Sequence, residues 1–405
     1  MAVTPYCILI HYHEISLKGK NRRWFEKRLL KNIRTQLGGL PYSSVQHNAS
    51  RIFCFGVEKM QWKAYGSRLK RVMGIKHATL MSQVSAEMDC IKDEVLKQLE
   101  GRAFDSFRIS ARRQYKEFPL TSQEINEAIG TAVISTYNKK VNLKHADIDV
   151  MIQLIKGMAY VGCDRIYGYG GLPVGCSEKA ISMISSGIDS PVASFEMLKR
   201  GVDLTYVHFH SAPATNRQSI RNVKGILKVM ATYQIRCKLH LVPLLEIQQK
   251  IMADAPNKLW VILFRRAMVK LACMLADKED IPALVSGESV GQVASQTLSN
   301  IRATSDAGDR PILRPLSGMN KDEIVEKAEK IGSYEISIEP YDDCCSFFIP
   351  MHPETKADLD RVRKTEAGIE FGNLFQNALE NTEFESIDCG DYKLKKTNMT
   401  EAVHD

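Results

Sequence analysis

The chain has 405 residues, of which 44% are hydrophobic and 25% charged, and its formal net charge at pH 7 is +8. This length predicts two or three domains, because single cores stop growing near ~250–300 residues, and the composition excludes a disordered, collagen-like or coiled-coil chain. No long uninterrupted apolar run and no basic leader segment are present, so we expect a cytoplasmic protein without a membrane-spanning helix.

Positive charge is concentrated in the first part of the chain. Residues 1–175 hold 27 Lys and Arg against 15 Asp and Glu, whereas residues 176–405 hold 28 against 32. Such an asymmetry predicts a polyanionic partner for the basic part, with nucleic acid as the first candidate. The ten cysteines include no CxxC pair and no Cys/His spacing of a zinc site, which disfavours both a disulfide framework and a structural metal.

The hydrophobic pattern of the basic part predicts a mixed α+β architecture. Strands are expected at 6–12, 51–56, 75–83, 106–112, 147–154 and 158–163, and helices at 21–37, 59–73, 88–99 and 121–137. The Gly- and Pro-rich segment 168–173 then predicts a linker.

After this linker the pattern changes to a regular alternation of strands and helices. Strands are expected at 180–184, 203–209, 238–243 and 281–286, and helices at 190–200, 216–233, 244–253 and 259–277. This alternation is typical of a parallel sheet with helices on both faces, in which ligands bind beyond the carboxyl ends of the strands. The polar tail after about residue 365 predicts little beyond one helix near 373–380.

Small and polar residues at 185–191, with the sequence SSGIDSP, separate the expected strand 180–184 from a helix. Small residues allow backbone amides to approach a phosphate, and the following helix N-terminus adds unsatisfied N–H groups. The alternative is an ordinary turn in which Asp189 or Ser190 only caps the helix. The segment alone does not decide between them, and it matches neither GxxxxGK[ST] nor GxGxxG.

Four stretches together resemble one known family. SSGIDS at 185–190 resembles the SGGxDS loop (PP-loop) of ATP pyrophosphatases. The others are HYHEISLKGKNRR at 11–23, FPLTSQEIN at 118–126 and GESVGQVASQT at 287–297. Jointly they resemble the tRNA 4-thiouridine synthetase (tRNA uridine 4-sulfurtransferase) family, in its form without a rhodanese domain, from residue 5 to about 355.

The resemblance implies three domains. They are an N-terminal ferredoxin-like domain at 1–60, a THUMP RNA-binding domain at 61–165, and a C-terminal PP-loop ATP pyrophosphatase domain at 173–395 with a doubly wound parallel sheet. The implied reaction uses ATP and Mg²⁺ to adenylate O4 of uridine 8 of tRNA and then replaces that oxygen with sulfur from a protein persulfide. A homodimer is also implied, and a link to sulfur supply for thiamine synthesis is left open.

The resemblance also assigns nucleotide contacts residue by residue. The implied ATP-binding residues are Met183, Ile184, Ser185, Gly187, Asp189, Ser190, His208, Phe209, Arg265, Gly287 and Gln296. Asp189 is in addition the implied catalytic carboxylate and Mg²⁺ ligand, since adenylation needs charge stabilisation at the pyrophosphate. Taken singly, Ile184 and Phe209 are better explained as core residues, and Arg265 could be a solvated helix charge.

One residue departs from the family pattern. Ser186 replaces the first glycine of the loop. If this position requires a positive φ, serine would cost of order 1 kcal/mol in strain.

Sulfur transfer is assigned to the stretch YDDCCS at 341–346. The resemblance implies Cys345 as the catalytic cysteine and Cys344 as the second choice. The acidic neighbours should raise rather than lower a thiol pKa, so the residues alone do not predict an activated thiolate. Without a rhodanese domain, sulfur is expected from a cysteine desulfurase or another persulfide donor.

Basic residues of the first part are the expected RNA contacts. They are Lys18, Lys20, Arg22, Arg23, Arg112, Arg113 and Lys116. Each run could also be a solvated surface. Two other functions remain open from the sequence: a different PP-loop chemistry, such as tRNA 2-thiolation or amide formation, and a non-catalytic RNA-binding protein with a decayed loop.

Overall fold

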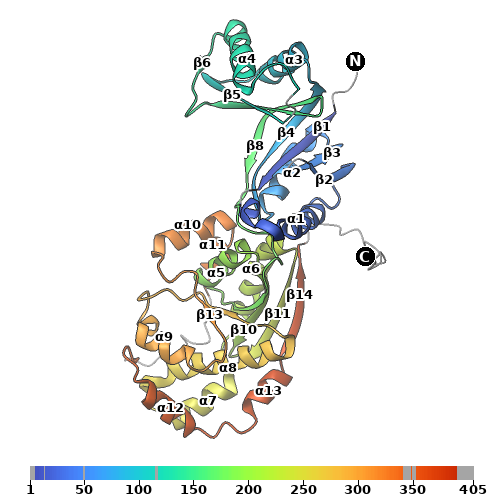
Figure 1. The fold of residues 1–405 in the computed structure, drawn as a ribbon. Coiled ribbons are helices and arrows are strands. Elements are labelled where there is room, and N and C mark those ends of the chain that lie inside the picture. Colours follow the sequence, from blue (N-terminus) through green and yellow to red (C-terminus); the bar gives the residue numbers. More distant parts are fainter. Residues whose placement is uncertain are drawn as a thin grey trace, which may run out of the picture. The chain divides into compact units, whose positions relative to one another are not determined.

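The computed structural model describes residues 5–12, 14–48, 51–114, 117–340, 348 and 353–389. The chain forms two compact units that divide between Leu172 and Pro173, inside the expected linker. Each unit has its own sheet and is described by itself (Figure 1).

The first unit contains an eight-stranded sheet and four α-helices within its described residues. The strands are β1 (Tyr6–Tyr12), β2 (Ser44–Asn48), β3 (Arg51–Phe55), β4 (Ile75–Ser85), β5 (Ser106–Arg113), β6 (Lys140–Val141), β7 (Ile148–Ile155) and β8 (Met158–Tyr167). The helices are α1 (Arg22–Gln36), α2 (Trp62–Lys70), α3 (Met88–Leu99) and α4 (Ser122–Tyr137).

The sheet has the order β2-β3-β1-β4-β8-β7-β5-β6, so one continuous sheet runs through the expected ferredoxin-like and THUMP regions. The long strands β4 and β8 connect the end near α1 and α2 with the end near α3 and α4 (Figure 1). Local sequence explains individual boundaries. Thr121 and Glu124 form a capping box that starts α4, and Asn138 ends it in the left-handed conformation with φ 52°.

The second unit is an α/β layer structure. Its strands are β9 (Lys179–Met183), β10 (Asp203–His210), β11 (Arg236–Pro243), β12 (Leu284–Val285), β13 (Ile312–Leu313) and β14 (Glu383–Asp388). Its helices are α5 (Asp189–Lys199), α6 (Gln218–Gln234), α7 (Leu245–Asp254), α8 (Trp260–Glu279), α9 (Leu298–Ser305), α10 (Lys321–Ile331), α11 (Tyr334–Ser337), α12 (Leu359–Ala367) and α13 (Leu374–Glu380).

The strand order β13-β12-β9-β10-β11-β14 creates a switch point beside β9. From β9 the chain adds β10 and β11 on one side, and it then crosses to add β12 and β13 on the other, all in parallel. The crevice at such a point, beyond the strand ends, is the expected ligand site of a doubly wound sheet. Buried side chains such as Ile181, Val207 and Phe264 belong to one core that holds the strands against the helices.

The structure corrects the sequence prediction for the tail. The helix expected near 373–380 is present as α13. Residues Glu383–Asp388, however, form the unexpected strand β14, which pairs antiparallel with β11 and makes the sheet mixed rather than wholly parallel. The strand was not predicted because its segment contains many charged residues. These residues form ion pairs at a sheet edge: Glu385 with Lys224, and Asp388 with Arg236 at 2.7 Å.

Candidate functional site

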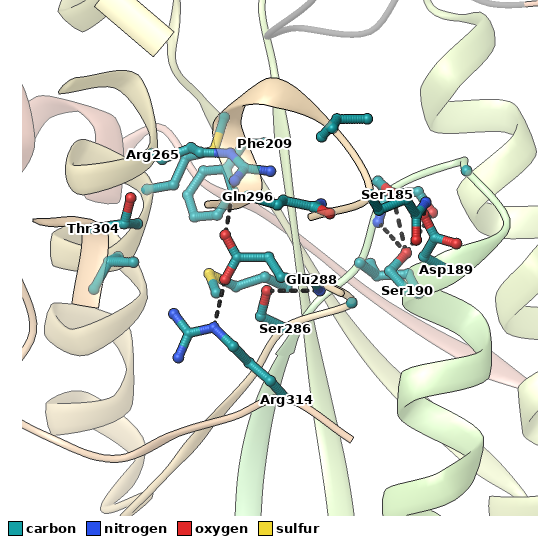
Figure 2. Close-up of a pocket in the computed structure, with 18 of the residues that line it drawn as sticks. Ser185, Asp189, Ser190, Phe209, Arg265, Ser286, Glu288, Gln296, Thr304 and Arg314 are labelled. Carbon is teal, nitrogen blue, oxygen red and sulfur yellow. Dashed lines mark hydrogen bonds and ion pairs between the residues drawn. The ribbon is translucent and has the colours of Figure 1, made fainter. Parts of the chain in front are cut away.

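A cavity of about 430 Å³ lies at the carboxyl ends of β9, β10 and β12 (Figure 2). The eleven residues expected to bind ATP all line it: Met183, Ile184, Ser185, Gly187, Asp189, Ser190, His208, Phe209, Arg265, Gly287 and Gln296. Its volume is in the range of small-molecule and cofactor pockets. The switch point of the sheet therefore brings together residues from sequence positions 183 to 296.

The loop between β9 and α5 is closed by serine hydrogen bonds. The backbone N–H of Ser185 donates to Ser190 Oγ at 2.8 Å, and Ser190 Oγ donates back to the carbonyl of Ser185 at 3.1 Å. The loop thus folds onto the first turn of α5, whose N-terminal N–H groups and dipole favour an anion. Neither Asp189 nor Ser190 caps the helix, because the N-cap residue of α5 is Ile188 and no side chain of the described residues makes a capping hydrogen bond there. Ser190 instead closes the loop and also lines the cavity.

Gly287 explains how closely the segment after β12 approaches this loop. A Cβ atom built there would lie 2.7 Å from the N atom of Ser190 and 2.8 Å from its Cα atom. Side-chain carbon atoms do not approach backbone atoms so closely, so only glycine fits this position.

Ser186 does not carry the strain considered from the sequence, because it does not have a positive φ. Its side chain is 1% exposed, and its hydroxyl has no hydrogen-bond partner in the described part of the chain. Serine in place of glycine at this position therefore requires no left-handed backbone conformation.

Asp189 is held by two residues that the sequence did not suggest. Its Oδ1 atom accepts from Lys321 Nζ at 2.6 Å, and its Oδ2 atom accepts from Gln292 Nε2 at 2.9 Å. Lys321 starts α10, 132 residues after Asp189. A lysine at this loop can neutralise negative charge on a bound phosphate, but no local signal marked it in the sequence.

His208 is a buried neutral acceptor in the wall of the cavity. Burial, with a smaller contribution from His210, lowers the pKa of His208 to about 4 against the opposing hydrogen bond to Ile184. Nδ1 lies 3.0 Å from the carbonyl oxygen of Ile184 and must donate to it, so Nε2 carries the lone pair. Nε2 is buried without a partner among the described residues, and it suits an N–H donor of a ligand.

A partly buried ion network forms another wall of the cavity. Glu288 accepts from Arg265 at 2.7 Å and from Arg314 at 2.6 Å (Figure 2). Arg314 also donates to Ser305 at 2.8 Å. Arg265 is therefore a positioned charge rather than a solvated one. Glu288 and Arg314 are further site residues that the sequence analysis missed, because their partners lie 23 and 26 residues away.

Ile184 and Phe209 are 3% and 6% exposed and also line the cavity, so the core and binding interpretations are compatible. Gln296 is buried, and its Oε1 atom accepts from the backbone N–H of Ser289 at 3.4 Å. This contact fixes the side chain between the segment after β12 and the cavity.

The sulfur-transfer residues and one RNA contact lie outside the described residues. They are Cys344, Cys345 and Lys116. The eight cysteines that the structure does describe are free thiols. Within the described ranges no group of three or more His, Cys, Asp or Glu side chains could hold a metal ion, and no helix is long and apolar enough to span a membrane.

The other expected RNA contacts lie in the first unit in different settings. Lys20 and Arg23 are exposed, whereas Arg22 donates to Glu26 at 2.7 Å and to the Tyr12 hydroxyl at 2.9 Å. The ammonium group of Lys18 lies 5.1 Å from the ring centre of Phe25.

Arg112 and Arg113 are adjacent in β5, so their side chains point to opposite faces of the sheet. Arg113 donates to the carbonyl of Phe118 at 2.7 Å, and Arg112 is exposed.

Three family models match the chain. The ferredoxin-like domain of ThiI matches residues 7–79, the THUMP domain matches residues 85–164, and the model described as thiamine biosynthesis protein (ThiI) matches residues 175–371.

Curated relatives match along nearly the whole chain. A probable tRNA sulfurtransferase of Moorella thermoacetica is 39% identical over 382 residues, which cover 94% of this chain and 97% of the relative. One of Thermus thermophilus is 39% identical over 372 residues, with coverage of 92% and 91%.

A solved structure is also similar, the crystal structure of a 4-thiouridine synthetase–RNA complex with bound ATP. It has a TM-score of 0.85 and 34% identity, and the match covers 95% of this chain and 100% of the solved chain.

Proposed function

The chain belongs to the ThiI family of tRNA sulfurtransferases, and from this premise we propose that it uses ATP to convert uridine 8 of tRNA into 4-thiouridine. In the first step O4 of the uridine attacks the α-phosphate of ATP, and pyrophosphate leaves. In the second, the outer sulfur of a persulfide attacks C4, and AMP leaves with the original oxygen. A second thiol then attacks the remaining S–S bond, which releases 4-thiouridine and leaves a disulfide between the two thiols. The observation that carries this proposal is the cavity at the strand ends, which is lined by residues of the loop 185–190 and the start of α5.

Different walls of the cavity suit different parts of the ATP molecule. The loop and the N-terminus of α5 offer N–H groups and hydroxyls to the pyrophosphate. Ile184 and Phe209 offer apolar surface to the base, and Nε2 of His208 accepts from an N–H group such as the adenine amino group. This arrangement combines an apolar sandwich with few oriented polar groups, as nucleotide pockets do.

Three charges support the adenylation step. Lys321 beside the loop and Arg265 in the opposite wall can stabilise the negative charge that develops as pyrophosphate departs. Asp189 is the residue that would hold Mg²⁺. A single carboxylate fits this ion, because Mg²⁺ binds proteins through one or two carboxylates together with substrate phosphates. The bound Mg²⁺ would neutralise negative charge on the phosphates.

The source and path of sulfur form the second part of the proposal. Cys345, with Cys344 beside it, receives sulfur from a cysteine desulfurase or another persulfide donor. The family name supports a link between this sulfur supply and thiamine synthesis. We further propose a homodimer and, because the substrate is tRNA, a cytoplasmic location.

Replacing Asp189 tests the proposal. Asp189→Ala should lower tRNA-dependent AMP formation by at least about 100-fold, since metal and pyrophosphate contacts act only at the charged step, while tRNA affinity stays unchanged. Asp309→Ala is the matched control, because Asp309 is a carboxylate of the same unit that pairs with Arg310 and does not line the cavity. Wild-type AMP formation by Asp189→Ala would contradict the assignment.

Nucleoside analysis of tRNA from a deletion strain separates the alternatives. Loss of 4-thiouridine at position 8 is expected. Loss of a 2-thiolated base would favour the other PP-loop chemistry, and an unchanged nucleoside profile would favour a non-catalytic RNA-binding protein.

A further inference from the structure

One face of the sheet in the first unit is separate from the core under α3 and α4. Side chains at alternate positions, such as Ile109 of β5 and Ile152 of β7, pack into that core with Ile125 of α4. The residues between them face the other way. This second face carries a small core of its own, made of Cys7, Leu9, Phe53, Met81, Met151, Ile155 and Tyr160.

The second face is strongly concave. Arg51 of β3 donates to Gln153 of β7, although β1, β4 and β8 lie between these strands. In a flat sheet four strand spacings would separate them by roughly 19 Å, which is beyond the reach of the two side chains. The rings of Phe53 and Tyr160, whose centres are 5.1 Å apart, bridge the same hollow.

Basic side chains gather on this concave face. His11 of β1 and His77 of β4 are opposite each other in the sheet, and their rings stack at 4.3 Å. Arg165 of β8 donates to Thr79 at 3.3 Å on the same face. We call His11, Arg51, His77, Arg112 and Arg165 the arginine–histidine cluster.

The charges of the cluster show that its members lie within electrostatic reach of each other. Burial, then His77 and then Arg51, Arg112 and Arg165, lower the pKa of His11 to about 2. Burial and then Arg165 lower the pKa of His77 to about 4. Burial and then Arg112 lower the pKa of Arg51. Positive charge on the arginines thus adds to the effect of burial at these sites, although Asp149 opposes it at His77.

Acceptors for this charge are few among the described residues. Asp149 accepts from Arg165 at 3.2 Å, but it is shared with Arg108. Arg51, 8% exposed, donates to the uncharged amide of Gln153. The Nη2 atom of Arg165 and the Nδ1 atoms of both histidines are buried without a partner in the described part of the chain. Buried polar groups normally have partners. Nη2 of Arg165 can only donate, so it indicates an absent acceptor, whereas the Nδ1 atom of a neutral histidine can donate or accept.

We propose that the arginine–histidine cluster binds one phosphate group of the RNA backbone. Guanidinium groups bind phosphate with paired, charge-assisted hydrogen bonds, and double-stranded RNA is recognised largely through its phosphates and shape. The inference rests on the proposed function, because it takes tRNA as the polyanion. It assigns four RNA contacts beyond the expected basic residues, His11, Arg51, His77 and Arg165, and joins them to Arg112.

Equilibrium binding of tRNA over a series of salt concentrations tests the cluster. The variants are Arg112→Gln, Arg165→Gln and both together. The control is Arg102→Gln, which removes the same charge from the same unit. Arg102 is already neutralised by two 2.8 Å hydrogen bonds to Asp164.

Each single cluster variant should lower tRNA affinity about ten-fold at low salt, as expected for a lost charged hydrogen bond. The double variant should lose less than the product of the two single losses. Its log–log salt slope should fall by ~0.7–0.9, the value for one phosphate. The control should keep the wild-type slope.

Several results would contradict the proposal that the cluster binds one phosphate. A slope decrease of ~1.4–1.8 in the double variant would mean two separate phosphates, and an equal loss in the control would mean a general charge effect. If Arg165→Gln does not fold, Arg165→Lys replaces it. That variant keeps the charge but loses the planar fork, so affinity should fall while the slope stays. If the wild-type chain itself does not bind tRNA, the proposed function fails; if it binds and the cluster variants bind equally well, only this inference fails.

Discussion

The close approach of Gly287 to Ser190 makes Gly287→Ala a sharp test of the nucleotide site. The added Cβ would lie 2.7 Å and 2.8 Å from backbone atoms of Ser190. Carbon atoms at optimal separation are 3.5–4.0 Å apart, so the loop or the segment after β12 must move by about 0.8 Å or more. Both partners are backbone, so rotation of a side chain cannot relieve the clash.

The displacement acts on the start of α5, where Ser190 closes the loop. Overpacking of this kind costs about 1–3 kcal/mol of unfolding free energy, and a 1 Å misplacement of a positioned group can cost about 100-fold in rate. We therefore expect kcat/KM for ATP in tRNA-dependent AMP formation to fall about 100-fold, while the protein remains folded at 25 °C.

Gly318→Ala is the matched control, because a Cβ there would meet nothing within 4 Å and the residue has no positive φ. It should retain wild-type kinetics and thermal stability. Wild-type kcat/KM in Gly287→Ala would refute the reasoning. A loss of equal size in Gly318→Ala would show that any added methyl group in this unit is harmful.

Four further expectations follow from the site and its surroundings. Glu288→Gln should lower the unfolding free energy by about 1–3 kcal/mol, because Arg265 and Arg314 are half-buried cations that lose their shared carboxylate; an unchanged urea midpoint would contradict this. Lys321→Gln should reduce kcat for AMP formation at least about ten-fold, measured at saturating ATP. Cys345→Ser should still form AMP on tRNA but yield no 4-thiouridine with a persulfide donor, with Cys344→Ser milder; equal yields from both variants and wild type would remove these cysteines from the mechanism. The folded pKa values of His77 and His208 are about 4, below the unfolded value of 6.5, so the unfolded state binds protons first as pH falls. The unfolding free energy should therefore decrease from pH 6.5 towards pH 4, by up to about 1.4 kcal/mol per pH unit for each histidine. In chemical denaturation, His208→Gln should flatten this pH dependence.

Sequence periodicity determined most of the regular elements. Strand β1 and helices α1, α4 and α8 lie where alternating or 3.6-residue patterns predicted them, because each pattern reflects one buried face of a local element. The loop 185–190 was also visible locally, since a turn of small residues between a strand and a helix is contiguous in the chain.

Elements that depend on contacts at the edge of a sheet could not be predicted from local sequence patterns. The strand β14 forms because it pairs with the edge of β11 and because Lys224 and Arg236 donate to its acidic side chains, Glu385 and Asp388. Nothing in the isolated polar segment favours a strand, so its conformation was decided by tertiary pairing.

For the candidate site, too, some features could be predicted from the sequence and others depend on the tertiary structure. Motif resemblance named the eleven cavity residues, but only the strand order places β12 beside β9 and so brings Gly287 against Ser190. Lys321 reaches Asp189 across 132 residues, and Arg51 reaches Gln153 across 102. Such contacts depend on sheet order and curvature, which no local pattern encodes, so the sequence determined which chemistry was available and the tertiary structure decided which charges meet.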